Sequence, residues 1–349
     1  MRRSLMLATL GILVSGAVAF GQADVNKVLA DARQAMGGQK KLDAVKTITA
    51  TGRTVRTMPN GNATEGDFEM ALELPDKFVR RDVLAAMGNM SVYRLSGFNG
   101  DGAINETDTP PQLSTGNVIV QFRTAGPGGG DPATMTPEQK EAARQRMVQS
   151  AKRDFAKLAL GMLVQSPAYP ITFTNGGTAE SPDGTADVVN VKGENFEAKL
   201  FIDTKTHLPL MLSWMDKEPL RIVRQMGGPG GPGGAAPAGA GGGNVVVMGG
   251  GGGTFTTSSG GGQAAKGTPP TAEEMEKLKQ QAADQMKEAE ANRRTVEFRL
   301  YYADYQAEDG VMLPHRLQSS VDGKPTEEIT FEKVKVNQKI DPKRFTVSK

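Results

Sequence analysis

Hydrophobic and polar residues alternate over much of the chain. The pattern is clearest in 66–74, where Phe68, Met70, Leu72 and Leu74 share one side and acidic residues occupy the other. Such a period predicts a strand with one buried and one wet face, as in antiparallel sheets. Similar patterns recur along the chain, and we expect about ten or eleven strands in all.

Helical periodicity appears in three places between these strands. Asp24 is placed to cap a first helix, and capping boxes at 136–139 and 271–274 open two more. The helix after 136–139 should run to about Val164 and carries the strongest apolar stripe. Helices and strands do not alternate regularly, which disfavours a parallel doubly wound sheet. We therefore predict an α+β fold that is mainly antiparallel β.

The first 23 residues read as a cleaved secretory signal peptide. Arg2 and Arg3 precede an uncharged stretch over 5–19, and small residues follow it. An apolar stretch of about 15 residues is shorter than the roughly 20 that span a membrane. Cleavage after Gly21 and cleavage after Ala23 both fit. We expect the mature protein to be periplasmic or secreted, with no transmembrane span.

A glycine-rich insert interrupts what we predict to be a single domain over 24–349. The insert, 227–267, holds nearly half of the 43 glycines. Glycine loses more entropy on ordering than such a segment recovers by burial, so we expect disorder here. The apolar stretch 244–248 could form a short strand or a contact surface, but we expect it to share that disorder.

Composition removes several classes of function. The chain has no cysteine, which excludes disulfides, thiolate metal sites and a lipid-modified N-terminal cysteine. The formal net charge of +2 disfavours a nucleic-acid partner, and the signal peptide's Arg2 and Arg3 account for it. We expect no cofactor.

No catalytic or metal-binding pattern stands out. His207 and His315 are the only histidines, and each lies beside a Leu-Pro pair at a predicted strand entrance. A zinc site needs further ligands at defined spacing, and the sequence contains no HExxH. A Gly-x-Ser-x-Gly nucleophile motif is also absent. We predict a protein that is not an enzyme, with no catalytic residues and no metal.

Four segments share a recognisable order along the chain. They are 32–46 with its Gly37-Gly38 pair, 66–81 with Pro75-Asp76-Lys77, the hairpin 201–209, and the C-terminal stretch 309–345. In this order they resemble the periplasmic lipoprotein-carrier group of the LolA, LolB and LppX kind, and its outer-membrane lipoprotein-sorting relatives. The resemblance implies a half-open β-barrel curved around amphipathic helices, with an apolar interior suited to acyl chains. The carriers' transfer residues have no matching positions here.

We therefore expect an exported protein that binds or carries a lipid or lipoprotein acyl chains, with an envelope protein as a further candidate partner. The alternative is an envelope structural or interaction protein whose core is filled. The candidate cavity lining consists of apolar strand residues, and ordinary core is the competing interpretation for each. These residues are Phe68, Met70, Leu72, Phe78, Tyr93, Phe98, Leu200, Leu212, Trp214, Phe298 and Leu300.

Overall fold

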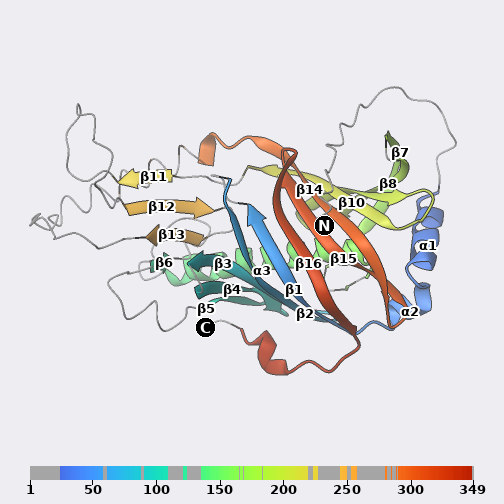
Figure 1. Cartoon of the computed structure of the whole chain (residues 1–349), viewed down its shortest axis with the longest axis horizontal. Coiled ribbons are helices and arrows are strands. Elements are labelled where there is room, and N and C mark those ends of the chain that lie inside the picture. Colours follow the sequence, from blue (N-terminus) through green and yellow to red (C-terminus); the bar gives the residue numbers. More distant parts are fainter. Residues whose placement is uncertain are drawn as a thin grey trace, which may run out of the picture. The chain divides into compact units, whose positions relative to one another are not determined.

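The structure is a computed structural model of the whole chain (Figure 1). It describes residues 24–57, 61–87, 90–108, 121–123, 135–164, 166–167, 169–182, 184–218, 223–226, 244–249, 253–257, 280, 284, 288 and 290–347. The predicted signal peptide lies outside these residues.

The chain forms two compact units, which are described separately. The first consists of Met1–Glu106, Met147–Asp216 and Val296–Lys349, and the second of Thr107–Arg146 and Lys217–Thr295. The prediction of one domain interrupted by an insert stays a prediction.

An antiparallel sheet of 12 strands dominates the first unit (Figure 1). Its order is β5-β4-β3-β2-β1-β16-β15-β14-β10-β9-β8-β7. Most neighbours in this order are consecutive along the chain, so the sheet consists largely of hairpins and meanders. The bounds are β1 (Thr47–Thr57), β2 (Ala63–Glu73), β3 (Lys77–Met87), β4 (Met90–Asn99), β5 (Gly102–Asp108), β7 (Thr172–Ser181), β8 (Gly184–Gly193), β9 (Phe196–Asp203), β10 (Pro209–Lys217), β14 (Thr295–Glu308), β15 (Val311–Val321) and β16 (Lys324–Val336).

The mainly antiparallel α+β prediction is confirmed, but the expected number of strands is too low. The sequence pattern missed β5, whose short stretch lacks a run of alternating residues. The pairing of β1 with β16 contains a bulge at Glu332, because Thr51 pairs with Lys333 while the next residue, Gly52, pairs with Phe331.

Three helices have their full bounds within the described residues: α1 (Val25–Ala35), α2 (Gln39–Asp43) and α3 (Pro137–Gly161). Asp24 caps α1 as predicted, accepting from the backbone N–H of Asn26. The capping box of α3 is also confirmed: Thr136 and Gln139 each accept a hydrogen bond from the other's backbone N–H. No helix in the described part is long and apolar enough to cross a membrane.

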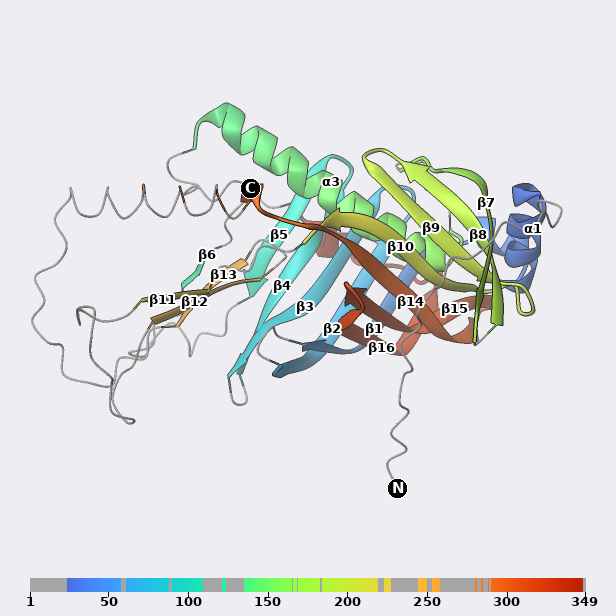
Figure 2. The same cartoon turned by 90° about the horizontal axis from the view of Figure 1, so that it is seen from above.

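Helix α3 lies along one face of the 12-stranded sheet, called here the inner face (Figure 2). From Met147 onward the helix belongs to the first unit. Its Phe155 and Leu158, together with Met162 just after the helix, share one core cluster with strand residues from both halves of the sheet. The opposite, outer face has a smaller cluster in which Phe345 of the 3-10 turn η3 (Pro342–Phe345) joins residues such as Val79 and Ile104.

The second unit contains a sheet of four strands in the order β11-β12-β13-β6. These strands are β6 (Gln121–Arg123), β11 (Val223–Met226), β12 (Asn244–Gly249) and β13 (Gly253–Thr257). Two of them, β12 and β13, lie inside the glycine-rich insert, and β12 is the short strand that the apolar stretch 244–248 could form; the disorder of the insert as a whole stays a prediction. Its uncharged β-branched run pairs with β11 and β13 on either side.

The second predicted capping box lies outside the described residues. Further along the same predicted helix, Gln280, Asp284 and Glu288 are helical. These three residues lie within the helix that the sequence predicts after the capping box at 271–274.

Candidate functional site

The inner face of the sheet carries most of the residues predicted to line a cavity. Where α3 crosses β3 and β4, the ring of Phe155 packs against Phe78 and Phe98, each at 5.8 Å between ring centroids. Phe78 and Phe98 also lie 6.3 Å apart across the two strands. All three side chains are buried. At this place the helix occupies the volume that a ligand would have to fill.

Two tyrosines of β14 fix the C-terminal half of α3. The Tyr302 hydroxyl donates a 2.6 Å hydrogen bond to the backbone carbonyl of Lys157. The Tyr305 hydroxyl lies 2.9 Å from the carbonyl oxygens of both Gly161 and Pro209. Burial raises the pKa of both phenols, so they remain neutral donors at ordinary pH. These bonds hold the helix end against the sheet.

A charged cluster interrupts the apolar inner face beside α3. Arg80 of β3 pairs with Asp82 through two hydrogen bonds of 2.7 and 2.6 Å. Glu327 of β16 accepts a 2.6 Å bond from Arg56 and lies 3.5 Å from Arg80. Strand alternation places these residues on the side of the buried Phe78, Ala50 and Ile329. Charged side chains therefore occupy positions where the apolar pattern would continue.

Arg94 of β4 extends the cluster toward β5. It pairs across the strands with Asp82, and its side chain donates to the Asn105 amide oxygen at 3.3 Å. The Asn105 amide nitrogen in turn lies 3.4 Å from the Met147 sulfur of α3. Asn105 thus contacts both Arg94 and Met147, where α3 enters this unit.

The pKa values in the cluster reflect burial and mutual charge. Burial would raise the pKa of Glu327, but Arg80 and Arg56 lower it below its usual value. Burial lowers the pKa of Arg94, and the positive charges of Arg80 and Arg56 lower it further, against the opposing effects of Asp82 and Asp154. Burial thus acts against the charged forms of Glu327 and Arg94, and the opposite charges around each favour them.

An aromatic group lies on the other side of the inner face. Trp214 of β10 stacks on Phe298 of β14, with 5.6 Å between ring centroids and 17° between planes. The Lys157 ammonium of α3 lies 4.5 Å from the Trp214 ring centroid, and the Phe196 ring packs at 6.4 Å. Trp214 and Phe298 are only half-buried, whereas Leu212 and Leu300, two residues away on the same strands, are sealed.

The cross-strand register connects the charged cluster to the aromatic group. Arg56 pairs with Glu327, Glu327 with Ser319, and Ser319 with Leu300, which is two residues from Phe298. The register thus joins Arg56 on β1 to Leu300 on β14, and Arg80 of β3, which pairs with Met70, reaches this row through its contact with Glu327. We call the following residues of the inner face the inner strip: Arg94, Arg80, Asp82, Arg56, Glu327, Ser319, Leu300, Phe298 and Trp214.

The structure divides the eleven predicted lining residues into three groups. Trp214 and Phe298 are half-buried on the inner face, and Tyr93 lies elsewhere. The remaining eight are buried core in the cluster that includes α3: Phe68, Met70, Leu72, Phe78, Phe98, Leu200, Leu212 and Leu300.

Tyr93 contacts Arg81, whose guanidinium carbon lies 3.5 Å from its ring centroid. It is separated from the inward-facing Phe98 by five positions, an odd number, so strand alternation places it on the outer face. Tyr93 is therefore not brought together with the other predicted residues.

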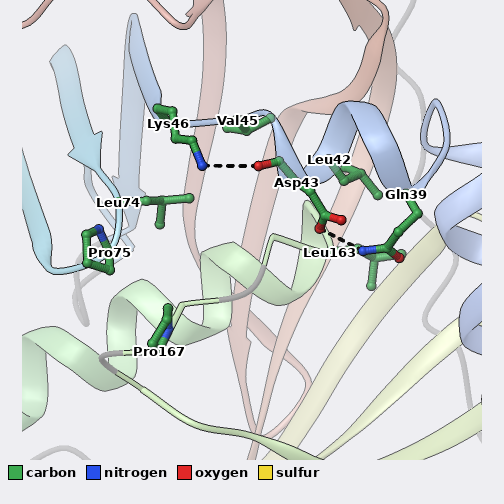
Figure 3. Close-up of a pocket in the computed structure, with 9 residues that line it drawn as sticks. All are labelled: Gln39, Leu42, Asp43, Val45, Lys46, Leu74, Pro75, Leu163 and Pro167. Carbon is green, nitrogen blue, oxygen red and sulfur yellow. Dashed lines mark hydrogen bonds between the residues drawn. The ribbon is translucent and has the colours of Figure 1, made fainter.

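A small pocket lies elsewhere in the first unit, at the start of β1 (Figure 3). Its volume is about 240 Å³, slightly below the usual range of ligand sites. Asp43 accepts hydrogen bonds from Gln39 at 2.7 Å and, through its carbonyl, from Lys46 at 3.3 Å. None of the predicted lining residues borders this pocket. Its lining is Gln39, Leu42, Asp43, Val45, Lys46, Leu74, Pro75, Leu163 and Pro167.

The two histidines lie apart from the inner strip. His207 occupies the turn between β9 and β10 with a φ of 58°, and His315 is buried on β15 with Nε2 3.2 Å from Glu308. Within the part of the chain that the structure describes, no three histidine or acidic side chains are grouped so as to hold a metal ion.

Comparison with known proteins gives matches to solved structures alone. No family model matches the chain, and no curated protein matches its sequence. A DUF1329 family protein from Desulfovibrio piger is similar at 8% identity and a TM-score of 0.42, over 93% of this chain and 97% of that one.

Two further solved structures bear names from the group that the sequence resembles. A candidate outer membrane lipoprotein-sorting protein domain from Vibrio parahaemolyticus matches at 9% identity and a TM-score of 0.40, over 92% of this chain and 97% of that one. A LolA superfamily protein from Nitrosomonas europaea matches at 8% identity and a TM-score of 0.37, over 93% of this chain and 98% of that one.

Proposed function

We propose that this protein is a non-enzymatic, exported protein that binds or carries a hydrophobic ligand, a lipid or the acyl chains of a lipoprotein, in the periplasm or outside the cell. The observation that carries the proposal is the half-buried Trp214–Phe298 stack at the margin of α3. Large apolar rings left partly in contact with water beside a sealed core offer surface that a ligand can cover. The sequence resemblance to lipoprotein carriers supports the same class.

The energetic basis is burial of apolar chain against these rings. Each methylene removed from water contributes about 0.8 kcal/mol before ordering costs are subtracted. The sealed cluster around Phe155 is already filled, so a ligand in this conformation contacts Trp214 and Phe298 rather than Phe78 and Phe98. An open apolar cavity at Phe78 and Phe98 would require α3 to move away from the sheet.

Lipid extraction and native mass spectrometry of the purified mature protein test the proposal, together with titration of a fluorescent fatty acid. We expect saturable binding that weakens at least tenfold in Trp214→Ala, because the largest ring of the stack is lost. Met215→Ala is the matched control, since this neighbouring side chain is 62% exposed. Absence of co-purified lipid together with absence of fatty-acid binding would contradict the proposal.

The second candidate is an envelope interaction protein with a filled core. The burial of eight predicted lining residues beneath α3 favours it. In that case Trp214→Ala and Met215→Ala proteins behave alike in every lipid-binding assay. The titration above therefore decides between the two functions.

A further inference from the structure

The pocket at the start of β1 has apolar walls from three separate parts of the chain (Figure 3). Helix α2 and the residues after it contribute two of these walls, the turn after β2 contributes two, and the segment after α3 contributes two. The Ser166 hydroxyl donates to the backbone carbonyl of Pro75 and joins the second part to the third. The fold therefore brings the apolar walls together, and they consist of Leu42, Val45, Leu74, Pro75, Leu163 and Pro167.

Lys46 provides the positive charge of this pocket. Its backbone N–H donates a 2.7 Å hydrogen bond to the Asn337 amide oxygen, and its carbonyl accepts a 2.8 Å bond from the backbone of Leu74. The ammonium group donates to the backbone carbonyl of Asp43 at 3.3 Å, and it makes no ion pair within the described residues. An ammonium has three N–H donors, so the others remain for a ligand.

The carboxylate of Asp43 is the other charge in the lining. It accepts a 2.7 Å hydrogen bond from the side-chain amide of Gln39. Burial lowers the pKa of Arg33, and the negative charge of Asp43 opposes this effect, so these two charges attract each other. Asp43 thus has an amide donor and a guanidinium in its surroundings, whereas the Lys46 ammonium contacts a neutral carbonyl. The pocket therefore favours an anionic ligand over a cationic one.

We propose that this pocket binds a small apolar carboxylic acid, whose carboxylate pairs with Lys46 and whose hydrocarbon part lies against Leu42, Leu74 and Leu163. The volume of about 240 Å³ lies below that of most ligand sites, so it suits a short chain or a single ring. A charged hydrogen bond beside apolar walls is stronger than the same bond in water. No residue of this lining belongs to the inner strip, and the inference goes beyond the proposed function without resting on it.

The test compares hexanoate with hexanol and hexylamine, which have the same number of carbon atoms and differ in the charge of the polar end. Binding to the full-length mature protein is measured by saturation-transfer NMR at neutral pH. We expect hexanoate to bind about tenfold more tightly than hexanol, and hexylamine to bind most weakly. In Lys46→Gln the preference for hexanoate over hexanol should fall to about two-fold or less, whereas Lys46→Arg, which keeps the charge, should retain most of it.

Lys40→Gln is the matched control and should keep the parent's preference, because this exposed lysine of α2 does not line the pocket. Leu74→Phe places a larger side chain in the wall and should weaken hexanoate and hexanol alike. It provides a second variant should Lys46→Gln fail to fold, as judged by thermal unfolding. Asp43→Asn should bind hexanoate at least as tightly as the parent, because a like charge is removed. Trp214→Ala should bind all three probes as the parent does, since Trp214 does not line this pocket.

The outcomes keep this site separate from the proposed function. Equal binding of hexanoate and hexanol, or a preference that survives Lys46→Gln, overturns the carboxylic-acid site. Tightest binding by hexylamine also overturns it, because Asp43 would then be the recognition group. Loss of hexanoate binding in Trp214→Ala would place the acid on the aromatic stack and overturn the pocket as its site. The proposed function is tested with long-chain lipids at Trp214, so either proposal can fail while the other stands.

Discussion

Two parts of the inner face, built on the same strands, have opposite character. Beneath α3, Phe78 and Phe98 are sealed by Phe155 in a three-ring cluster. Beside the helix, the inner strip contains charged side chains and a half-buried aromatic stack. One part is ordinary protein core and the other keeps access to water. The comparison shows that one sheet face of this fold can be sealed in one place and open to water in another.

The largest expected effect comes from the sealed part. Phe155→Ala should lower the free energy of unfolding by about 3–5 kcal/mol, because it leaves a cavity between two buried rings. Urea denaturation measures the change. Leu210→Ala, at a 40% exposed position of β10, is the control and should cost no more than about 0.5 kcal/mol. Similar costs for the two variants would show that α3 is not packed on the sheet.

Glu327→Gln probes the charged cluster and should cost about 1.5–3 kcal/mol at pH 7, since Arg56 and Arg80 lose a charged acceptor. The pKa of this carboxyl is lowered in the folded protein, so its contribution is present above its usual pKa. It is lost as pH falls through the lowered value. Urea denaturation between about pH 7 and pH 3 should therefore show a weaker pH dependence in Glu327→Gln. An unchanged dependence would mean that the ion pairs do not persist in solution.

Gly161→Ala tests the attachment of the helix end. A Cβ at Gly161 would overlap the ring of Tyr302, so the last turn of α3 must shift. We expect a loss of about 1–3 kcal/mol in the free energy of unfolding. In the double variant with Tyr302→Ala the two losses should be less than additive, because the overlap is gone. If the two losses were strictly additive, the cost of Gly161→Ala would not come from the overlap with the Tyr302 ring.

The smallest effect is expected at the border between the two parts. Lys157→Met removes the ammonium group over the Trp214 ring and its ion pair with Asp154. The free energy of unfolding should fall by about 0.5–1 kcal/mol in Lys157→Met, whereas the Lys157→Arg variant should be as stable as the parent. Thermal unfolding of the three proteins side by side provides the check. A Met variant as stable as the parent would show that the contact contributes nothing.

The sequence predicts the helices and strands better than it predicts which of them pack together. Alternation located Phe68, Met70 and Leu72 on one strand face, and the helical stripe located Phe155. Neither pattern predicts that the apolar side of α3 covers the inner face of the sheet. The sequence of a buried position is the same whether protein or a ligand covers it. The eight sealed residues show this limit.

Two features of the site could have been predicted from the sequence. The odd separation of Tyr93 from Phe98 already places them on opposite faces. Arg80 and Arg94 stand at apolar positions of their strands, two residues after Phe78 and four before Phe98, which marks a polar interruption. Their assembly with Glu327 was not predictable, since it depends on pairing between strands far apart in the chain.

The most direct test uses the single tryptophan of the chain, Trp214, as the reporter. Its fluorescence is recorded while a fatty acid brominated along its chain, a quencher that acts only on contact, is titrated into the mature protein. We predict saturable quenching with the same midpoint as binding measured by native mass spectrometry. Binding by mass spectrometry without quenching of Trp214 would contradict the account, because the ligand would then lie away from the inner strip.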